Sequence, residues 1–384
     1  MEQLVTSDFK LGIIAGGQLG KMLVLAASNW DVKTCILDTD EHCPASTCCT
    51  QFVKGNQLDY DTVIRFGCMV DMITFEIENV NIEALQKLKA QGKKIFPDPD
   101  ALAIIQDKGL QKEFYKNNKI PSPQFFLFKN KAEIIVASQA GEITFPFVQK
   151  LRKGGYDGKG VSIIHSQNYL KNLLEGASLV EKLIEIQTEI SVIVARNLKG
   201  EIKCFPVVEM EFNEANLVEK LVCPSSLNEK ILQQATEIAT QLIASFNLCG
   251  ILAVEMFVDK NNVVWVNEIA PRPHNSGHHT IESVITSQYE QLLRAIFNFP
   301  LGSTQLKMPS IMINLLGEPN YEGPVKYEGL TDCLGIEGVK IHLYGKKITK
   351  PYRKMGHVTI LATSIEEAKK KAGIVKQKLK VKSW

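Results

Sequence analysis

Residues 264–280 read Val-Trp-Val-Asn-Glu-Ile-Ala-Pro-Arg-Pro-His-Asn-Ser-Gly-His-His-Thr, and this stretch constrains the fold and the site more than any other. A short apolar strand pattern ends in Asn267 and Glu268, and a polar loop follows at once. Two prolines flank Arg272 and restrict its backbone. A rigid loop that carries a carboxylate, an arginine, histidines and an amide indicates a metal beside an anionic substrate rather than a plain connection.

The strand that ends in this way is expected to pair with the strand pattern before it, Val254–Val258. Between the two, residues 259–262 read Asp-Lys-Asn-Asn, which is typical of a hairpin turn. The hairpin would place Glu255 and Glu268 near each other on one face. Because two close carboxylates repel, a cation must compensate, and magnesium prefers such oxygen ligands when it holds nucleotide phosphates. The alternative is a surface cross-strand pair, which would leave the surrounding apolar residues unexplained.

Toward the N-terminus, strand patterns alternate with helix patterns. Strands are expected at 11–15, 33–37, 72–75 and 94–96, and helices at 21–28 and 82–90. This series predicts a parallel sheet with helices on both faces. After the first strand, the turn Ala15-Gly16-Gly17-Gln18-Leu19-Gly20 resembles a dinucleotide-binding fingerprint with alanine in place of the first glycine, and Asp38 ends the second strand. A tight turn, or an anion site at the helix N-terminus, explains the same residues.

The middle of the chain has a largely antiparallel pattern, and its end is strand-rich again. Strands are expected at 145–150, 161–165, 179–183, 187–194, 202–208, 308–315, 339–344 and 357–362, and helices at 229–246 and 364–380. The loop at 153–160, Lys-Gly-Gly-Tyr-Asp-Gly-Lys-Gly, lies between the first two of these strands. Its glycines would let the backbone approach phosphates and close as a lid, with Lys150 nearby for phosphate oxygens. A flexible hairpin is the alternative.

Length and composition narrow the class of protein. At 384 residues the chain is expected to form domains at 1–97, 98–305 and 306–384, with a mobile lid subdomain at about 125–185. The net charge of +2 argues against a nucleic-acid or membrane partner, and no apolar run is long enough to cross a bilayer. The N-terminus lacks the order of a signal peptide, and nine scattered cysteines suit reduced thiols, so a cytoplasmic enzyme is expected.

A second basic cluster lies near the C-terminus, where residues 352–357 read Tyr-Arg-Lys-Met-Gly-His. Together with Arg272, His274 and Asn275 it could grip one small anionic substrate between two domains, since arginines bind phosphate or carboxylate through paired hydrogen bonds. A basic run alone would usually be solvated surface. A zinc site is not expected, because the cysteine-rich cluster near the N-terminus fits no zinc spacing. That cluster consists of His42, Cys43, Cys48 and Cys49.

These motifs together resemble those of the ATP-grasp superfamily. The resembling stretches lie at 17–20, 74–80, 154–160, 267–278 and 353–357 and follow the family's order. The run Ala-Pro-Arg-Pro-His-Asn-Ser-Gly-His within the fourth stretch is specific to the branch that carboxylates an aminoimidazole ribonucleotide and to its nearest relatives. The resemblance implies an ATP-grasp fold of α/β and α+β class, with an N-terminal Rossmann-like preATP-grasp domain and a small C-terminal β-rich domain.

The resemblance also implies roles for individual residues. ATP would be bound by Lys108, Lys150, Gly155, Tyr156, Asp157, Gly158, Lys159, Gly160, Glu181, Lys182, Leu183, Ile184, Glu189, Asn267 and Glu268. Magnesium, with two ions expected during turnover, would be held by Glu255 and Glu268. The ribonucleotide would contact Gln18, Leu19, Glu76, Asn275, Lys346, Arg353 and Lys354. The residues implied at the reacting groups are Tyr156, Asp157, Lys159, Arg272 and His274.

The activity implied by the resemblance is an ATP- and bicarbonate-dependent carboxylation in purine biosynthesis. Bicarbonate attacks the γ-phosphate of ATP and gives carboxyphosphate and ADP. The exocyclic amine of 5-aminoimidazole ribonucleotide then takes up the carboxyl group, directly or through released CO2. Because carboxyphosphate hydrolyses readily in water, the protein must neutralise charge, position the reactants and exclude water. A homodimer is expected from the resemblance alone.

Two positions depart from the family's pattern: Ala15 replaces a frequent glycine, and Phe212 stands where histidine is frequent, so no nucleotide contact is carried over to it. Three other classes remain open. The first is a sibling ligase that uses formate and glycinamide ribonucleotide, but the run at 274–277 favours the carboxylating branch. The second is a nicotinamide-dependent oxidoreductase, which would leave the later motifs unused. The third is a non-catalytic nucleotide-binding module, against which Glu255 and Glu268 argue.

Overall fold

A parallel sheet forms the N-terminal part of the chain. The computed structural model describes residues 6–154, 160–214 and 217–384. The sheet consists, in order, of β3 (Gln51–Lys54), β2 (Lys33–Asp38), β1 (Lys10–Ile14), β4 (Met72–Phe75) and β5 (Lys94–Ile95). Leu11 and Ile13 pack with α1 (Gln18–Ser28), whereas Ile14 packs with α2 (Tyr60–Cys68) and α3 (Ile82–Ala90). The predicted parallel sheet with helices on both faces is therefore confirmed.

The chain reverses its direction across this sheet at β1, which lies between β2 and β4. In open α/β sheets, ligands bind outside the carboxyl ends of the strands at such a switch point. Ala15 begins the loop after β1 with a φ of 69°, a left-handed conformation that costs a non-glycine residue about 1–2 kcal/mol. Glu76 begins the loop after β4, and its backbone N–H donates to the carbonyl of Ile14 at 3.1 Å. The two loops therefore lie side by side.

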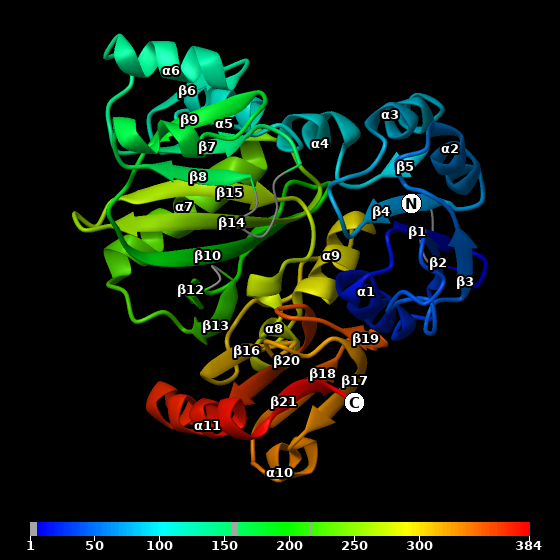
Figure 1. Cartoon of the computed structure of the whole chain (residues 1–384). Coiled ribbons are helices and arrows are strands. Elements are labelled where there is room, and N and C mark those ends of the chain that lie inside the picture. Colours follow the sequence, from blue (N-terminus) through cyan, green and yellow to red (C-terminus); the bar gives the residue numbers. More distant parts are fainter. Residues whose placement is uncertain (1–5, 155–159, 215–216) are drawn as a thin grey trace.

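A small antiparallel sheet follows, at the upper left in Figure 1. Its order is β6 (Phe125–Phe128), β9 (Ser178–Lys182), β7 (Phe147–Leu151) and β8 (Val161–Ile164), and α6 (Lys131–Gln139) covers it. The short helix η1 (Gln167–Asn172) follows β8. The predicted hairpin around the glycine-rich loop is confirmed, because β7 and β8 pair with Lys150 opposite Val161. Two helices, α4 (Pro99–Ile105) and α5 (Lys108–Asn117), connect this sheet to the first one.

The largest sheet crosses the middle of the molecule. Its path runs through β15 (Val264–Ala270), β14 (Gly250–Asp259), β10 (Ile186–Arg196), β12 (Val208–Phe212), β13 (Val218–Cys223), β16 (Ser310–Leu316), β20 (Lys354–Leu361) and β18 (Val339–Leu343), and β11 (Ile202–Cys204) pairs with β10 off this path. All these neighbours pair antiparallel. Three strands of the C-terminal part, β16, β18 and β20, therefore extend the same sheet as the Glu255–Glu268 hairpin.

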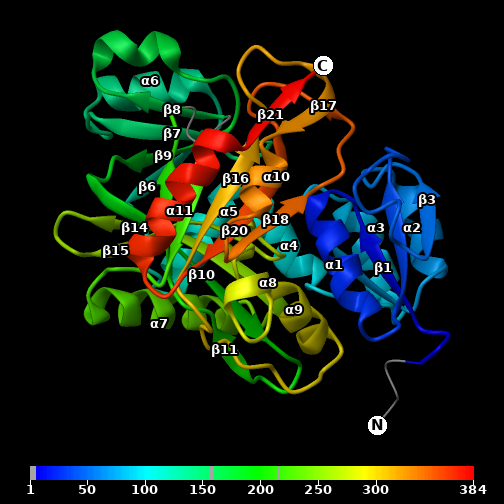
Figure 2. The same ribbon diagram turned by 90° about the horizontal axis from the view of Figure 1, so that it is seen from below.

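The helix α7 (Glu229–Ser245) packs on this sheet against β10, β14 and β11 (Figure 2). The side chain of Asn228 accepts a hydrogen bond from the backbone N–H of Ile231 at 3.1 Å and so caps the first turn. Buried apolar side chains then recur at helical spacing, from Ile231 through Ile238 to Leu242. Burying each large aliphatic side chain contributes about 1.5–3 kcal/mol, so packing rather than helix propensity holds α7 in place.

The remaining helices close the other end of the molecule. After β15 come η2 (Asn275–Gly277), α8 (Thr280–Ser283) and α9 (Gln288–Ile296), and α10 (Leu330–Leu334) and α11 (Ile365–Lys378) belong to the C-terminal part. A small sheet of β19 (Ile348–Thr349), β17 (Gly323–Glu328) and β21 (Lys380–Ser383) lies beside them. Figure 1 shows α8 next to the C-terminal strands β16 and β20. In the described part of the chain, no helix is both long and apolar enough to cross a membrane.

One predicted strand is wrong. Residues 202–208 are two strands, β11 and β12, that flank Phe205-Pro206-Val207. Proline lacks the backbone N–H that a sheet ladder needs, and it interrupts the strand here. A second difference concerns α1, which begins at Gln18 rather than at residue 21. The last three residues of the glycine turn, Gln18, Leu19 and Gly20, therefore begin the helix, and Gly17 is its N-cap.

Candidate active site

Glu255 and Glu268 are directly opposed in the pairing of β14 with β15, as the hairpin predicts. The pairing slips by one residue immediately after Glu255, between it and Met256. The side chain of Glu255 is 16% exposed and that of Glu268 is 47% exposed, so the pair lies at an opening rather than in the core. Glu189 on β10 contributes a third carboxylate whose charge reaches Glu255. The described residues contain no group of three histidines, cysteines or carboxylates arranged for a metal.

The two opposed carboxylates have pKa values shifted in opposite directions. Burial, followed by the charges of Glu268 and Glu189, raises the pKa of Glu255 above its ordinary value. Burial also favours the protonated form of Glu268, but the ammonium of Lys108, 2.7 Å from its Oε2, outweighs burial and lowers the pKa. Burial and like charges thus disfavour the ionised form of Glu255, whereas Lys108 favours the ionised form of Glu268. This is the charge pattern expected where a cation has to be accommodated.

Lys150 lies next to this pair and contacts the strand that carries Glu268. Its Nζ donates to Oδ1 of Asn267 at 2.8 Å and lies 2.7 Å from Oε2 of Glu181. Lys112 takes the other oxygen of Glu181 at 2.6 Å, and its Nζ also donates to the carbonyl of Val266 at 3.3 Å. The structure thus brings together five of the residues predicted to contact ATP, namely Lys108, Lys150, Glu181, Asn267 and Glu268.

Lys112 belongs to this cluster of charged side chains, and the sequence reasoning missed it. It lies four positions after Lys108 on α5, and residues at that spacing share one face of a helix. The spacing of the two lysines, directly after Asp107, was the signal that could have found it. Its side chain is 3% exposed, which requires a partner of opposite charge, and Glu181 supplies that partner.

The segment that leads into the glycine-rich loop is anchored to the start of α5. Arg152 reaches Asp107 through two hydrogen bonds, each of 2.8 Å, and the backbone N–H of Lys108 donates to the carbonyl of Arg152 at 3.0 Å. Gly154 and Gly160 have φ angles of 78° and 80°, which glycine tolerates without strain. The predicted residues Gly155, Tyr156, Asp157, Gly158 and Lys159 lie outside the described residues. Sequence reasoning also missed the pair of Arg152 with Asp107.

The loop after β15 turns toward the N-terminal sheet. Nε of Arg272 lies 2.8 Å from Oε1 of Glu78, a residue of the loop after β4. Glu76 in the same loop accepts hydrogen bonds from the backbone N–H groups of Gly17 at 2.8 Å and Gly20 at 2.7 Å. The carboxylate predicted to contact a ribonucleotide therefore also holds the glycine turn in place. Glu78 was not predicted, although it lies two residues after Glu76.

His274 connects the loop to the carboxylate pair. Its Nε2 lies 3.4 Å from Oε1 of Glu255, and its Nδ1 lies 2.9 Å from Oγ of Ser276. Burial lowers the pKa of His274 to about 3, and the positive charges of Arg272 and Lys354 act in the same direction. At neutral pH the imidazole is therefore uncharged. It can accept or donate a hydrogen bond at the site, but it does not serve as a permanent cation.

Of the C-terminal basic residues, Lys354 acts electrostatically on Glu255 and His274. Nζ of Lys346 donates to the carbonyl of Lys354 at 2.7 Å, and the guanidinium of Arg353 donates to the carbonyl of Ile348 at 2.5 Å. Lys21 on α1 donates to the carbonyls of Leu343 at 3.2 Å and Tyr344 at 3.4 Å. The helix that carries Gln18 and Leu19 is thereby joined to the segment that carries the three basic residues.

Other predicted residues lie at the edge of this arrangement. Glu181 and Lys182 are the last two residues of β9. Leu183 and Ile184 follow them in the connection to β10. Asn275 forms a reciprocal pair of amide hydrogen bonds with Asn314 on β16, of 2.8 and 2.9 Å. Phe212 packs in an apolar cluster with Met210 at the end of β12.

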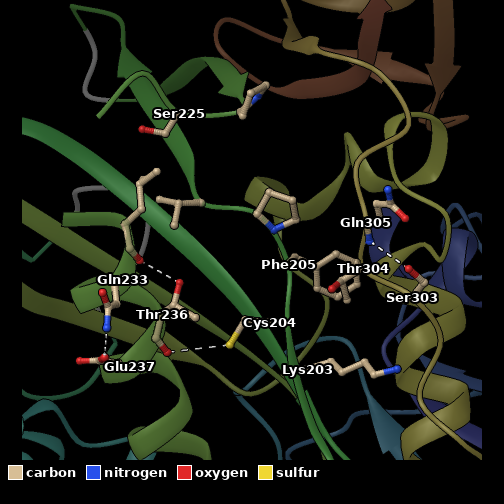
Figure 3. Close-up of a pocket in the computed structure, with 14 residues that line it drawn as sticks. Lys203, Cys204, Phe205, Ser225, Gln233, Thr236, Glu237, Ser303, Thr304 and Gln305 are labelled. Carbon is tan, nitrogen blue, oxygen red and sulfur yellow. Dashed lines mark hydrogen bonds between the residues drawn. The ribbon is translucent and has the colours of Figure 1, made fainter. Parts of the chain in front are cut away.

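A separate cavity of about 700 Å³ lies between β11, the segment 205–207 that follows it, α7 and the segment 303–305 (Figure 3). Cys204, Phe205, Gln233, Glu237 and Gln305 are among its lining residues. Of the described site residues, none lines this cavity. The candidate site is instead the region where α5, β15, α1 and the C-terminal strands converge.

Comparison with known families defines the class. The family model of the ATP-grasp domain matches residues 113–289, that of the ribonucleotide synthetase preATP-grasp domain matches 9–106, and that of the phosphoribosylaminoimidazole carboxylase C-terminal domain matches 310–371. Together with the opposed carboxylates and the converging lysines, these matches define an ATP-grasp protein, and the predicted fold class is confirmed.

Whole-chain relatives narrow the class further. N5-carboxyaminoimidazole ribonucleotide synthase of Bacillus subtilis is 34% identical over 95% of this chain and 95% of its own length. The crystal structure of the synthetase of that name from Thermotoga maritima has a TM-score of 0.90 at 44% identity, covering 98% of this chain and 100% of that chain. The chain belongs to the family of N5-carboxyaminoimidazole ribonucleotide synthases.

Other relatives are longer or carry ligands. The chloroplastic phosphoribosylaminoimidazole carboxylase of Vigna aconitifolia is 35% identical over 95% of this chain, which spans 66% of that protein. The chain thus spans just under two thirds of the length of this relative. A synthase from Aspergillus clavatus, solved in complex with ADP and 5-aminoimidazole ribonucleotide, has a TM-score of 0.88 at 30% identity and covers 97% of this chain and 99% of that chain.

Proposed function

We propose that the protein uses ATP and bicarbonate to carboxylate the exocyclic amine of 5-aminoimidazole ribonucleotide in de novo purine biosynthesis, giving N5-carboxyaminoimidazole ribonucleotide, ADP and phosphate. One observation carries the proposal. A single continuous segment runs from Asn267 and Glu268, beside Lys108 and Lys150, to Arg272 and His274. Groups suited to ATP and groups suited to an anionic acceptor therefore lie a few residues apart. The relative that holds ADP and the ribonucleotide together supports this arrangement.

On the ATP side, Lys108 and Lys150 would neutralise the phosphates after exchanging their present carboxylate and amide partners for phosphate oxygens. Magnesium fits Glu255 and Glu268, because two opposed carboxylates need a compensating cation and supply the oxygen ligands it prefers. When bound, the metal would supply charge neutralisation at the phosphates. Glu189 would accept hydrogen bonds from the ribose hydroxyls. The adenine would lie against the segment Glu181, Lys182, Leu183 and Ile184.

On the acceptor side, the ribonucleotide would be held by Gln18, Leu19, Glu76, Asn275, Lys346, Arg353 and Lys354. Asn275 can take part although it pairs with Asn314, since an amide has two donor hydrogens and two acceptor lone pairs and the pair uses only one of each. Arg272 would face the carboxyl group that is being transferred. Its ion pair with Glu78 fixes the guanidinium in one orientation.

The chemistry then follows in two steps. An oxygen of bicarbonate takes the γ-phosphoryl group of ATP, and ADP leaves. The amine nitrogen next forms a bond to the carboxyl carbon while phosphate leaves and the nitrogen loses a proton. His274 is uncharged at neutral pH, so it can accept a hydrogen bond from a reacting N–H group without adding charge. Tyr156, Asp157 and Lys159 remain predicted to act at this step, with the glycine-rich loop excluding water.

The test is phosphate release from ATP in the presence of bicarbonate, with and without 5-aminoimidazole ribonucleotide. We expect the ribonucleotide to stimulate release and a carboxylated product to form. Absence of stimulation would refute the proposed substrate. Formate-dependent turnover with glycinamide ribonucleotide would instead assign the protein to the sibling activity, glycinamide ribonucleotide transformylase.

Three further expectations belong to this proposal. The protein would act in the cytoplasm, in keeping with nine cysteines that are all free. It would form a homodimer, as expected from the resemblance. The division into domains at 1–97, 98–305 and 306–384 also remains a proposal. The pairing of β13 with β16 joins the last two of these domains in one sheet. We therefore expect these two domains to move as one body, except for the lid subdomain at about 125–185, which is expected to move relative to it.

A further inference from the structure

Three side chains form a row across the C-terminal strands, and we call them the sheet row. Asn314 on β16 is opposite His357 on β20, and His357 is opposite His342 on β18. Residues directly opposite in antiparallel strands point to the same face of a sheet. The rings of His357 and His342 are stacked at 4.5 Å with an angle of 8° between their planes, which confirms that they share a face.

A second row faces the first one, on the segment that follows the Arg272 loop. Asn275 pairs with Asn314 through two hydrogen bonds. The ring of His278 stacks on His357 at 4.7 Å, and Oε1 of Glu282 lies 3.1 Å from Nε2 of His342. Each member of the sheet row therefore has one partner on this segment, and the partners follow in the same order.

The two rows match in length. Positions 275, 278 and 282 have the three- and four-residue spacing of one helical face, and they lie in or beside η2 and α8. Seven residues of helix rise about 10 Å. Two steps between neighbouring strands span about 9.5 Å. A helical segment can therefore cross these strands with every contact in register, whereas a shift by one residue would lose all three contacts.

The contacts are anchored on both sides by buried tyrosines. The hydroxyl of Tyr344 lies 3.1 Å from Nδ1 of His357, and that of Tyr289 lies 3.1 Å from Nδ1 of His278. His278, His357, Tyr289 and Tyr344 are each no more than 1% exposed. Gln288 also holds the main chain of His274 at both its N–H and its carbonyl, at 2.9 and 2.8 Å. The segment 274–282 is thus held in place along its whole length, from His274 at the candidate site to Glu282.

We propose that the sheet row of Asn314, His357 and His342 is a set of positioning residues that fixes the 272–275 loop for ribonucleotide binding. The row would set the orientation of Asn275. It would also fix the loop that carries Arg272 relative to the strand that carries Lys354. This inference rests on the proposed function, since it assigns the ribonucleotide as the ligand of that loop. It concerns residues that do not themselves contact the substrate.

The experiment compares Asn314→Ala, Asn275→Ala and the double variant. We expect Asn314→Ala to raise the KM for the ribonucleotide roughly tenfold while the KM for ATP stays unchanged, because one amide pair is lost only on the acceptor side. In the Asn275→Ala background, Asn314→Ala should have no further effect on ribonucleotide KM, since it acts through Asn275. The Kd of the ribonucleotide, measured by calorimetry, should follow the same pattern without turnover.

A variant at the partly exposed end of the sheet row tests the same inference if the variants at Asn314 and Asn275 fold poorly. His342 is 28% exposed, and His342→Gln removes the contact of its imidazole with Glu282 at the edge of the row. We expect a several-fold rise in ribonucleotide KM. The matched control is Lys376→Ala, which removes an ion pair of 2.7 Å to Glu219 elsewhere in the C-terminal part and should leave both KM values unchanged.

The outcomes separate the two proposals. If wild-type protein neither binds nor responds to the ribonucleotide, the proposed function fails and this inference fails with it. If wild type responds but Asn314→Ala and His342→Gln keep its ribonucleotide KM, only the positioning role is overturned. Equal rises in the KM for ATP and for the ribonucleotide, or additive effects of Asn314→Ala and Asn275→Ala, would also overturn it, because they indicate a general loss of structure.

Discussion

Lys112 and Glu181 form an ion pair in the interior, with Nζ of Lys112 2.6 Å from Oε1 of Glu181 and only 3% of each side chain exposed. The second oxygen of Glu181 lies 2.7 Å from Nζ of Lys150. Burial would raise the pKa of Glu181, but Lys150 and Lys112 together lower it to about 2. One carboxylate thus holds two lysines, one of which is proposed to contact ATP. Lys112 therefore sets how strongly Glu181 retains Lys150.

Replacing Lys112 tests this relationship. In Lys112→Met the carboxylate of Glu181 stays buried with Lys150 as its remaining cationic partner, and we expect a loss of about 3 kcal/mol in the free energy of unfolding. We also expect a higher KM for ATP, because Glu181 then holds Lys150 more tightly. Urea unfolding and steady-state kinetics measure the two effects. Lys260→Met is the control: its pair with Glu185, at 2.8 Å, is exposed and should leave the urea midpoint unchanged. A Lys112→Met protein of wild-type stability would contradict the assigned role.

Glu268→Gln addresses the metal and phosphate side. The substitution removes one oxygen charge from the opposed pair and the partner of Lys108, so we expect near-complete loss of phosphate release. The side chain is 47% exposed, and the fold should therefore remain intact. Circular dichroism and the unfolding midpoint check the fold. Glu237→Gln, on the exposed face of α7, is the control and should retain turnover. Wild-type activity of Glu268→Gln would exclude a role for Glu268 in metal binding.

The parts of the site that lie close in sequence were predictable. Glu255 and Glu268 belong to one hairpin, and a short turn with a strand on each side fixes which residues face each other. The resemblance to a family supplied the fold and the lysines. The predicted strand at 202–208 failed because apolar content was followed across Pro206, where the ladder has to break.

The parts that depend on distant pairing were not predictable. Lys112 meets Glu181, and Asn275 meets Asn314, only because β9 and β16 occupy particular places in their sheets. Periodicity tells that a segment is a strand but not which strand it pairs with. For the same reason a separate C-terminal sheet was as consistent with the sequence as the observed continuation through β13 and β16. Whether a charged or amide side chain is buried can be predicted only when the position of its partner in the fold is known.

The pH dependence of ATP binding is expected to follow Glu189. Burial is the largest cause that raises the pKa of Glu189 to about 7; Lys150 opposes the shift and Glu268 adds to it. The ionised carboxylate is the better acceptor for ribose hydroxyls, so the KM for ATP should fall as the pH rises through about 7. Because ATP itself titrates nearby, Glu189→Gln is measured in parallel, and only the difference between the two profiles is assigned to Glu189.

The same raised pKa of Glu189 predicts that the stability of the fold decreases with rising pH, whereas ATP binding is expected to become tighter. A folded pKa of about 7 against an ordinary value of 4.5 means that the native protein binds the proton more tightly than the unfolded chain. Wild type should therefore lose stability relative to Glu189→Gln as the pH rises from about 4.5 to about 7. Urea unfolding at several pH values measures this difference. A constant difference across that range would show that Glu189 is not buried as described.

Gly17→Ala tests whether the glycine turn and Glu76 form one unit. A Cβ at position 17 would lie 2.4 Å from Oε1 of Glu76, and that carboxylate is held by the backbone N–H groups of both Gly17 and Gly20. Glu76 can move away only by giving up these bonds, so we expect a loss of about 1–3 kcal/mol in stability and a higher KM for the ribonucleotide. Gly373→Ala in α11 is the control, because its Cβ would meet no heavy atom within 4 Å. Since alanine is the better helix former, that variant should gain up to about 1 kcal/mol. Opposite shifts of the two melting temperatures are the expected result, and a Gly17→Ala protein that melts with wild type would mean that Glu76 relocates freely.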